Sequence, residues 1–186
     1  MIAGVEIVGI VGTAGSGKDT VAHILAGEYG FRRVALADGV RGALRDLYGP
    51  GWDITKAGGI TVRRALQVMG TECGRHVVHA NMWCDVLAAK LHFLRQYVVP
   101  SGETLRVVVP DIRFPSEADY LWGLAEPCHI VRITRPYAGL LGQAGQHRSE
   151  TLVDHIEADA VLLNNGTRAK LSRNIRRKMA KWEGEE

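Results

Sequence analysis

The chain has 186 residues, of which 46% are hydrophobic, and its 23 Lys and Arg against 20 Asp and Glu give a net charge of +3. This length suits one well-buried domain and is short for two. No apolar stretch approaches the length of a transmembrane helix, and the N-terminus lacks the pattern of a signal peptide. Three separated cysteines predict neither a disulfide framework nor a zinc site. We therefore expect a cytoplasmic protein without membrane contact, in the host cytoplasm if the source is viral.

Apolar runs at 5–11, 34–37, 105–110, 128–133 and 160–163 alternate with helical patterns. This alternation predicts βαβ units and a mainly parallel five-stranded sheet covered on both faces, a three-layer α/β/α fold. The segments 61–78 and 81–97 have helical periodicity with no strand signal between them. We expect a single domain over 1–186, with a helical insertion over about 40–100 and a glycine-punctuated lid loop over about 136–149.

The stretch from Gly12 to Thr20 has the spacing of a phosphate-binding P-loop and lies between the strand pattern at 5–11 and a helical pattern. Its glycines allow successive backbone N–H groups to point inward around phosphate oxygens, and the following helix adds its positive end. Lys18 would reach the β- and γ-phosphates. The alternative is a glycine-rich turn. The predicted nucleotide-binding residues are Gly12, Ala14, Gly15, Ser16, Gly17, Lys18, Asp19 and Thr20.

Asp19 occupies the position after the lysine where a Ser or Thr usually supplies a hydroxyl to Mg²⁺, and Thr20 comes one residue later. A carboxylate at this place could hold the metal or its waters, because Mg²⁺ prefers hard oxygen ligands. It could also lie beside an acceptor group near the γ-phosphate. Alternatively, Asp19 simply favours the first turn of the helix through the helix dipole.

A second constellation, Asp111, Arg113 and Glu117, follows the strand predicted at 105–110. A parallel strand delivers Asp111 at its carboxyl end, where open α/β sheets gather ligand groups and where P-loop proteins place a magnesium-binding aspartate. The planar guanidinium of Arg113 suits phosphate. Glu117 could fix that arginine or meet a sugar hydroxyl. The alternative is a capped helix with a surface ion pair, which would contribute little to stability. The candidate metal residues are Asp19, Thr20 and Asp111.

Arginines recur along the chain, as phosphoryl transfer requires if the protein is a kinase. Any single arginine is better explained by a solvated helix face. The group comprises Arg63, Arg64, Arg75, Arg132, Arg135 and Arg148.

Trp83 either stacks on a base or fills the core. The basic stretch 168–181 has apolar residues at helical spacing, so we interpret it as a docked helix with a solvated basic face and do not expect nucleic acid as a partner.

Several landmarks in order make the whole chain resemble bacteriophage-type deoxynucleoside monophosphate kinases, P-loop relatives of other small nucleotide kinases. These landmarks are Gly17 to Thr20, Val62-Arg63-Arg64 followed by Gly70-Thr71-Glu72, Trp83, Pro110-Asp111 with Arg113 and Glu117, Arg135-Pro136, His147 with Glu150, and Asn164 to Thr167. The resemblance implies transfer of the γ-phosphate of ATP, with Mg²⁺, to a deoxynucleoside monophosphate. Which base is accepted stays open, as does a homodimer.

The resemblance also implies a fold of the P-loop NTPase class, in which the helical insertion over about 40–100 binds the acceptor, and it implies roles for particular residues. The acceptor side would comprise Arg64, Trp83, Asp111, Arg113 and Glu117, to which we add Asp38 as a substrate-binding candidate. Arg135 and the loop after it would close over the phosphates, while Asn165 and Gly166 would lie near the adenine. We assign catalysis to Lys18, Asp19, Arg113 and Arg135. No general base is needed, because a phosphate monoester with a second pKa of about 6 is mostly a dianion at neutral pH.

Two other functions fit parts of the pattern. One is a kinase for another small phosphorylated acceptor, of the dephospho-coenzyme A or phosphomevalonate type. The other is a nucleotide-regulated module in which ATP closes the lid and the basic C-terminal helix meets nucleic acid.

Overall fold

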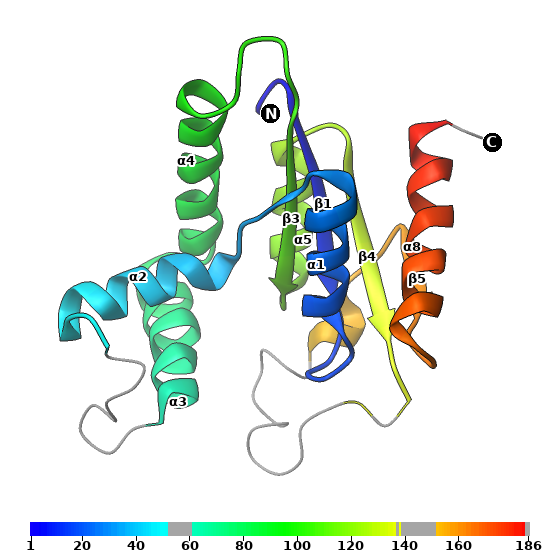
Figure 1. The fold of residues 1–186 in the computed structure, drawn as a ribbon. Helices are drawn as coiled ribbons and strands as arrows, with labels where there is room; N and C mark the ends of the chain where they lie inside the picture. The colour runs from blue at the N-terminus through cyan, green and yellow to red at the C-terminus, as the bar shows by residue number, and fades with distance from the viewer. Residues whose placement is uncertain (52–60, 137, 139–151, 185–186) are drawn as a thin grey trace.

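A computed structural model describes residues 1–51, 61–136, 138 and 152–184, and its centre is a five-stranded sheet (Figure 1). All strand pairs are parallel, and the strand order is β2-β3-β1-β4-β5. The strands are β1 (Val5–Val11), β2 (Arg32–Arg33), β3 (Leu105–Ile112), β4 (Cys128–Thr134) and β5 (Ala160–Leu163). This sheet confirms the predicted parallel architecture.

Helices cover both faces of the sheet, because alternate residues of the central strands are apolar and buried. On β1, Val8 and Ile10 face a core formed with α1 (Lys18–Tyr29) and α8 (Arg168–Glu183). Ile7 and Val11 face the opposite core, to which α4 (Met82–Tyr97) and α5 (Pro115–Leu124) contribute. Figure 1 shows α1 in front of the sheet and α5 behind it. The three-layer α/β/α fold is therefore confirmed.

The predicted helical insertion is present between β2 and β3. It contains α2 (Leu36–Tyr48), α3 (Val62–Gln67), the π-helical segment η2 (Val68–Val78) and α4. In Figure 1, α2, α3 and α4 lie to one side of the sheet. Residues 52–60 within this insertion lie outside the described part of the chain.

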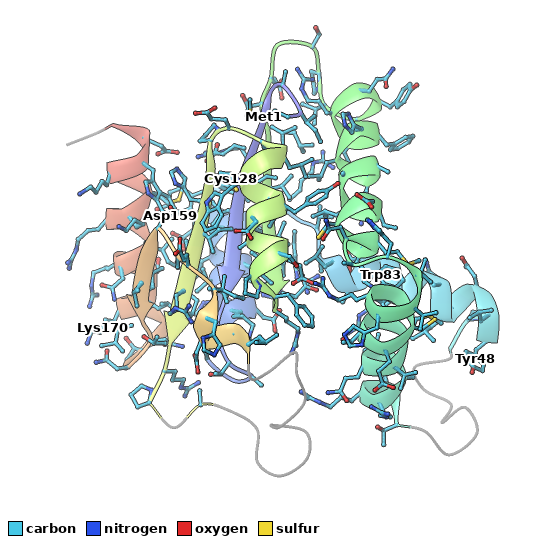
Figure 2. All side chains as sticks on the ribbon, turned by 180° about the vertical axis from the view of Figure 1, so that it is seen from behind. Met1, Tyr48, Trp83, Cys128, Asp159 and Lys170 are labelled. Carbon is cyan, nitrogen blue, oxygen red and sulfur yellow. The ribbon has the colours of Figure 1, made fainter. Side chains whose placement is uncertain are left out.

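Trp83 lies where the helices of the insertion meet, as Figure 2 shows. Its side chain is buried, and its Nε1 donates a hydrogen bond to the carbonyl of Gly70 at 2.8 Å. Gly74 allows close approach, since a Cβ there would lie 2.5 Å from the Trp83 Nε1. Because the indole N–H is satisfied and the ring is packed, Trp83 organises the insertion as a core residue, and it also lines the cleft described below.

The apolar run 34–37 was expected to be a strand, and that prediction is wrong. β2 comprises only Arg32–Arg33, and α2 begins at Leu36. The reason is tertiary: the carboxylate of Asp111 accepts hydrogen bonds from the backbone N–H groups of Leu36 at 2.9 Å and Ala37 at 2.8 Å. It thereby caps the N-terminus of α2 from β3, and a run of four apolar residues cannot reveal a cap that is distant in sequence.

The parallel strands bring all their carboxyl ends to one edge of the sheet. The P-loop follows β1 there, between the ends of β3 and β4. Ligands of open α/β sheets bind at this edge. Within the described ranges, none of the helices is both long and apolar enough to cross a membrane.

Candidate active site

Residues 12–17 form a tight loop between β1 and α1. The amide of Ser16 donates to the carbonyl of Thr13 at 3.2 Å, and Gly15 and Gly17 have left-handed φ angles of 77° and 104°. Gly17 is the N-cap of α1, so no side chain caps the first turn. The open N–H groups and the helix dipole together make this loop an anion site.

Lys18 is held across the loop that precedes it. Its Nζ donates to the carbonyls of Gly12 at 2.6 Å and Thr13 at 2.8 Å. The ammonium group therefore lies beside the backbone of the loop, where a bound phosphate chain would meet it. This geometry suits the predicted role of Lys18.

Asn164, directly after β5, braces the loop from the neighbouring part of the sheet. Its Nδ2 donates to the carbonyl of Ser16 at 2.8 Å, and its backbone N–H donates to Thr134 at 2.8 Å. Our sequence reasoning assigned no role to Asn164. Its position immediately after the last strand could have indicated such a role, because that end of β5 lies at the same edge of the sheet as the P-loop.

Replacing Gly17 with alanine is expected to distort the loop. A Cβ at this position would lie 2.4 Å from the Asn164 Nδ2, on a backbone with φ of +104°. We expect a loss of about 1–3 kcal/mol in the free energy of unfolding, as for other strained residues, together with weaker ATP binding. Urea unfolding and nucleotide titration would measure both. The control is Gly27→Ala in α1, where a Cβ meets nothing within 4 Å; comparable losses in the two variants would contradict the assignment.

A cleft of about 510 Å³ joins the P-loop to the helical insertion. Lys18 and Asp19 line one end, while α2, α3 and η2 contribute residues to the other. Its lining contains charged side chains of both signs, which suits a polyanion accompanied by a cation. The basic members are Lys18, Arg33, Arg41, Arg63, Arg75 and Arg113, and the acidic members are Asp19, Asp38, Asp111 and Glu117.

Asp111 and Arg113 both line the cleft at the end of β3, as the sequence predicts. Burial raises the pKa of Asp111, although its two backbone hydrogen bonds and the nearby Arg113 guanidinium oppose that shift. Asp38, in the first turn of α2, accepts from the Ala35 N–H at 3.0 Å and pairs with Lys90 at 3.3 Å. Both carboxylates therefore also fix the start of α2.

A buried ion pair between Arg75 and Glu117 closes the inner wall of the cleft. The Arg75 Nη1 lies 3.0 Å from the Glu117 Oε1, and their side chains are only 10% and 6% exposed. Arg75 also donates to the Ser116 Oγ at 2.9 Å and lies 4.0 Å from the centroid of the Phe114 ring. The pair ties η2 to the start of α5, and so fixes the insertion against the sheet.

The carboxylate of Glu117 also holds the backbone of Arg113, because the Glu117 Oε2 accepts a hydrogen bond from the Arg113 N–H at 2.8 Å. Its ion-pair partner is Arg75, which our sequence reasoning placed only in a general group of arginines. Burial raises the pKa of Glu117 to about 7, against the opposing effects of its hydrogen bonds and of Arg75. A carboxylate with such a pKa in a cleft is typical of functional sites.

The neighbouring arginines of α3 have different surroundings. Arg64, the predicted acceptor-binding residue, pairs with Glu72 at 2.6 Å, both being about half exposed, and it does not line the cleft. Arg63 does line it. Asp19 lies 3.6 Å from Arg33, another cleft residue that the sequence did not indicate.

Other predicted residues lie beyond the cleft walls. Arg135 is exposed after β4, and the exposed Asn165 accepts from the Lys170 Nζ at 3.0 Å, next to Gly166. Arg132 is structural, because it donates to the carbonyls of Val153 and Ile156. The lid prediction, with His147, Arg148 and Glu150, falls almost entirely outside the described residues.

Hard oxygen donors are available for Mg²⁺ in the cleft. The described residues contain no group of three or more His, Cys, Asp or Glu that could hold a metal alone. Mg²⁺ in phosphoryl-transfer sites usually needs only one or two carboxylates, the remaining ligands being phosphate oxygens and waters. Asp19 and Asp111 fit that requirement, whereas Thr20 does not line the cleft.

The P-loop, the parallel sheet and the inserted helices define this chain as a P-loop kinase in fold. Solved structures agree at the level of fold. A Thermus thermophilus protein matches with a TM-score of 0.56 and 22% identity over 94% of this chain and 96% of its own. A Janibacter sugar kinase has a TM-score of 0.53 at 16% identity, covering 96% and 94%. The dephospho-CoA kinase of Campylobacter jejuni has a TM-score of 0.50 at 14% identity, covering 96% and 98%.

Sequence comparison identifies the family. The family model for deoxynucleotide monophosphate kinase matches residues 52–175, and the chain therefore belongs to that family. An Acanthamoeba polyphaga mimivirus protein, provisionally named a deoxynucleotide monophosphate kinase, is 28% identical over 183 residues, covering 87% of this chain and 89% of its own. The resemblance noted from the sequence is thus confirmed, and the protein is a nucleotide-using phosphotransferase of this family.

Proposed function

We propose that the protein transfers the γ-phosphate of ATP to a deoxynucleoside monophosphate in a reaction that requires Mg²⁺. The observation that carries the proposal is one continuous cleft, which joins Lys18 and Asp19 of the P-loop to Arg63 and Arg113 of the acceptor side. Such a cleft can hold two phosphate chains end to end. Membership of the family supports a deoxynucleotide as the acceptor.

The proposed reaction joins a phosphate oxygen of the acceptor to the γ-phosphorus of ATP. The bond from that phosphorus to the oxygen shared with the β-phosphate breaks, and ADP leaves. Because the acceptor phosphate is already mostly a dianion, no side chain has to remove a proton first. The residues therefore act by placing and neutralising charge.

The P-loop amides and Lys18 hold the triphosphate, and Arg113 and Arg63 attract the acceptor phosphate. Asp19 and Asp111 would hold Mg²⁺, which would supply positive charge to neutralise the phosphates. Arg75 and Glu117 keep the acceptor wall in place. We retain Arg135, with the loop after it, for closure over the phosphates, and Asn165 and Gly166 for the adenine side, on the family resemblance.

An acceptor panel tests the proposal. Purified protein with ATP and Mg²⁺ is mixed with each of the four deoxynucleoside monophosphates, their ribose counterparts, dephospho-coenzyme A or no acceptor, and ADP release is measured. We expect release only with one or more deoxynucleoside monophosphates, and loss of activity with EDTA that excess Mg²⁺ restores. ATP hydrolysis at the same rate without an acceptor would refute the kinase assignment, and phosphorylation of dephospho-coenzyme A alone would move it to another acceptor.

Arg63→Gln is expected to raise KM for the acceptor by about 10-fold or more, the effect of losing one charge-assisted hydrogen bond to phosphate. Arg64→Gln is the matched control. Because Arg64 pairs with Glu72 on the surface, its loss should change KM by no more than a few-fold. Steady-state kinetics with the preferred acceptor measures both. The reverse ranking would return the acceptor role to Arg64.

A further inference from the structure

The C-terminal helix α8 carries a charge unlike that of the rest of the molecule. It contains seven Lys and Arg and one acid, Glu183, for a charge of +6. Since the whole chain has a charge of +3, the remainder has a charge of −3. Figure 1 shows α8 on the opposite side of the sheet from α2 and α3. The basic surface is therefore separate from the acceptor side of the cleft.

The docking of α8 does not use these charges. Leu171, Ile175 and Met179 are at most 2% exposed and pack with α1 and the sheet. The opposite side of the helix presents exposed basic residues at intervals of three and four, which we call the basic stripe: Lys170, Arg173, Arg177 and Lys181. It spans about 16 Å at 1.5 Å per residue.

Among the residues that the structure describes, the basic stripe has few anionic neighbours. Elsewhere in the described chain, Arg33, Arg64 and Arg106 each have a carboxylate partner. Among the described ion pairs, none involves a residue of the stripe, and Lys170 instead donates to the amide oxygen of Asn165. Glu183 is engaged by Arg106 of β3 at 2.5 Å. The stripe therefore keeps a concentrated positive potential toward solvent.

This arrangement costs the helix stability. Arg173 and Arg177, and then Arg177 and Lys181, are like charges four residues apart, which repel across one turn. Arg168 and Lys170 also place positive charge in a first turn that contains no acid, against the helix dipole. A helix adapted only for stability would have acids at such positions. A bound anion would offset these repulsions.

We propose that the basic stripe of α8 binds the phosphate backbone of nucleic acid, without reading its sequence. A row of regularly spaced cations on a rigid helix complements a chain that presents regularly spaced phosphates. The apolar residues of α8 that could anchor it in a membrane are buried in the sheet, and Trp182 stacks on His129 at 4.0 Å between ring centroids. The stripe also lacks the apolar centre of a protein interface. This proposal revises our expectation that nucleic acid is not a partner.

Fluorescence anisotropy of a labelled 20-nucleotide oligo-dT, titrated with the full chain at 50–200 mM salt, tests the proposal. Four phosphate contacts predict a slope of log K against log salt near −0.7 × 4, so that affinity falls about 50-fold over this range. The double variant Arg173→Gln/Arg177→Gln should bind more weakly at 50 mM salt. Its affinity should then fall only about 7-fold between 50 and 200 mM salt, because two contacts remain. The charge-matched control, Arg32→Gln/Arg45→Gln on β2 and α2, should behave as the parent protein.

Thermal unfolding separates loss of binding from loss of folding. Removing the like-charge pair should leave the midpoint of the Arg173→Gln/Arg177→Gln variant unchanged or higher. The variant should also keep its kinase activity with mononucleotide substrates. Failure of the proposed kinase function would then be seen separately from failure of nucleic-acid binding. Equal binding by the two double variants, or no binding at 50 mM salt, would overturn the proposal. So would equally effective competition by polyglutamate or by phosphatidylserine vesicles.

Discussion

Lys18→Ala is expected to lower kcat by a factor on the order of 10²–10³, the effect of removing one group that stabilises transition-state charge. Its ammonium lies within 2.8 Å of the carbonyls of Gly12 and Thr13, beside the loop amides. In the proposed reaction, charge shifts from the γ-phosphoryl group onto the leaving β-phosphate, where this positive charge would stabilise it. Initial rates of ADP formation at saturating acceptor, over a range of ATP concentrations, would measure the loss.

Two further measurements make the Lys18 result interpretable. The Lys18→Ala variant should unfold at nearly the same temperature as the parent protein, because this partly exposed side chain contributes little burial. Lys18→Arg keeps the charge but replaces a compact ammonium with a larger planar group, so it should restore activity only in part. Turnover of Lys18→Ala within a few-fold of the parent enzyme would show that the lysine role is wrong.

Arg75→Met is expected to cause the largest loss of stability among these variants. Removing one partner of a buried ion pair costs about 3–5 kcal/mol where the other partner is charged, here at pH 8, because the remaining carboxylate must stay charged in the interior or take up a proton. The loss should be larger at pH 8 than at pH 6. The pKa of Glu117, about 7, exceeds its ordinary value, so the folded state holds the Glu117 proton more tightly than the unfolded chain does. Glu117 therefore subtracts stability as pH rises from about 4.5 to 7.

Arg75 lowers the pKa of Glu117. Without Arg75 this pKa rises further, and the loss of stability therefore extends to higher pH. Urea unfolding at pH 6 and 8 would measure the difference. Arg64→Met on the neighbouring helix is the surface control, with an expected cost of at most about 1 kcal/mol. The double variant Arg75→Met/Glu117→Gln should recover part of the loss because no buried charge remains. A loss that does not change with pH would indicate that Arg75 contributes by packing alone.

The nucleotide site could be predicted because its determinants are local in the sequence. Nine consecutive residues, Gly12 to Thr20, specify the turns, the lysine and the helix start, and the apolar run before them specifies the strand. The alternation of buried runs with helical patterns predicted the layers of the sheet for the same reason. Asp111 and Arg113 could be predicted because β3 leads directly to them.

Only the tertiary structure decided which side chains meet across the insertion. Arg75 pairs with Glu117 over 42 residues, Asn164 braces Ser16 over 148, and Asp111 caps a helix that begins 75 residues earlier. No local pattern encodes such pairings, which depend on how the helices pack on the sheet. The sequence by itself therefore determined the phosphate-binding loop and the parallel α/β sheet that carries it. Packing decided that Arg63 and Arg75, and not Arg64, line the cleft, because the orientation of α3 and η2 depends on the buried contacts around Trp83.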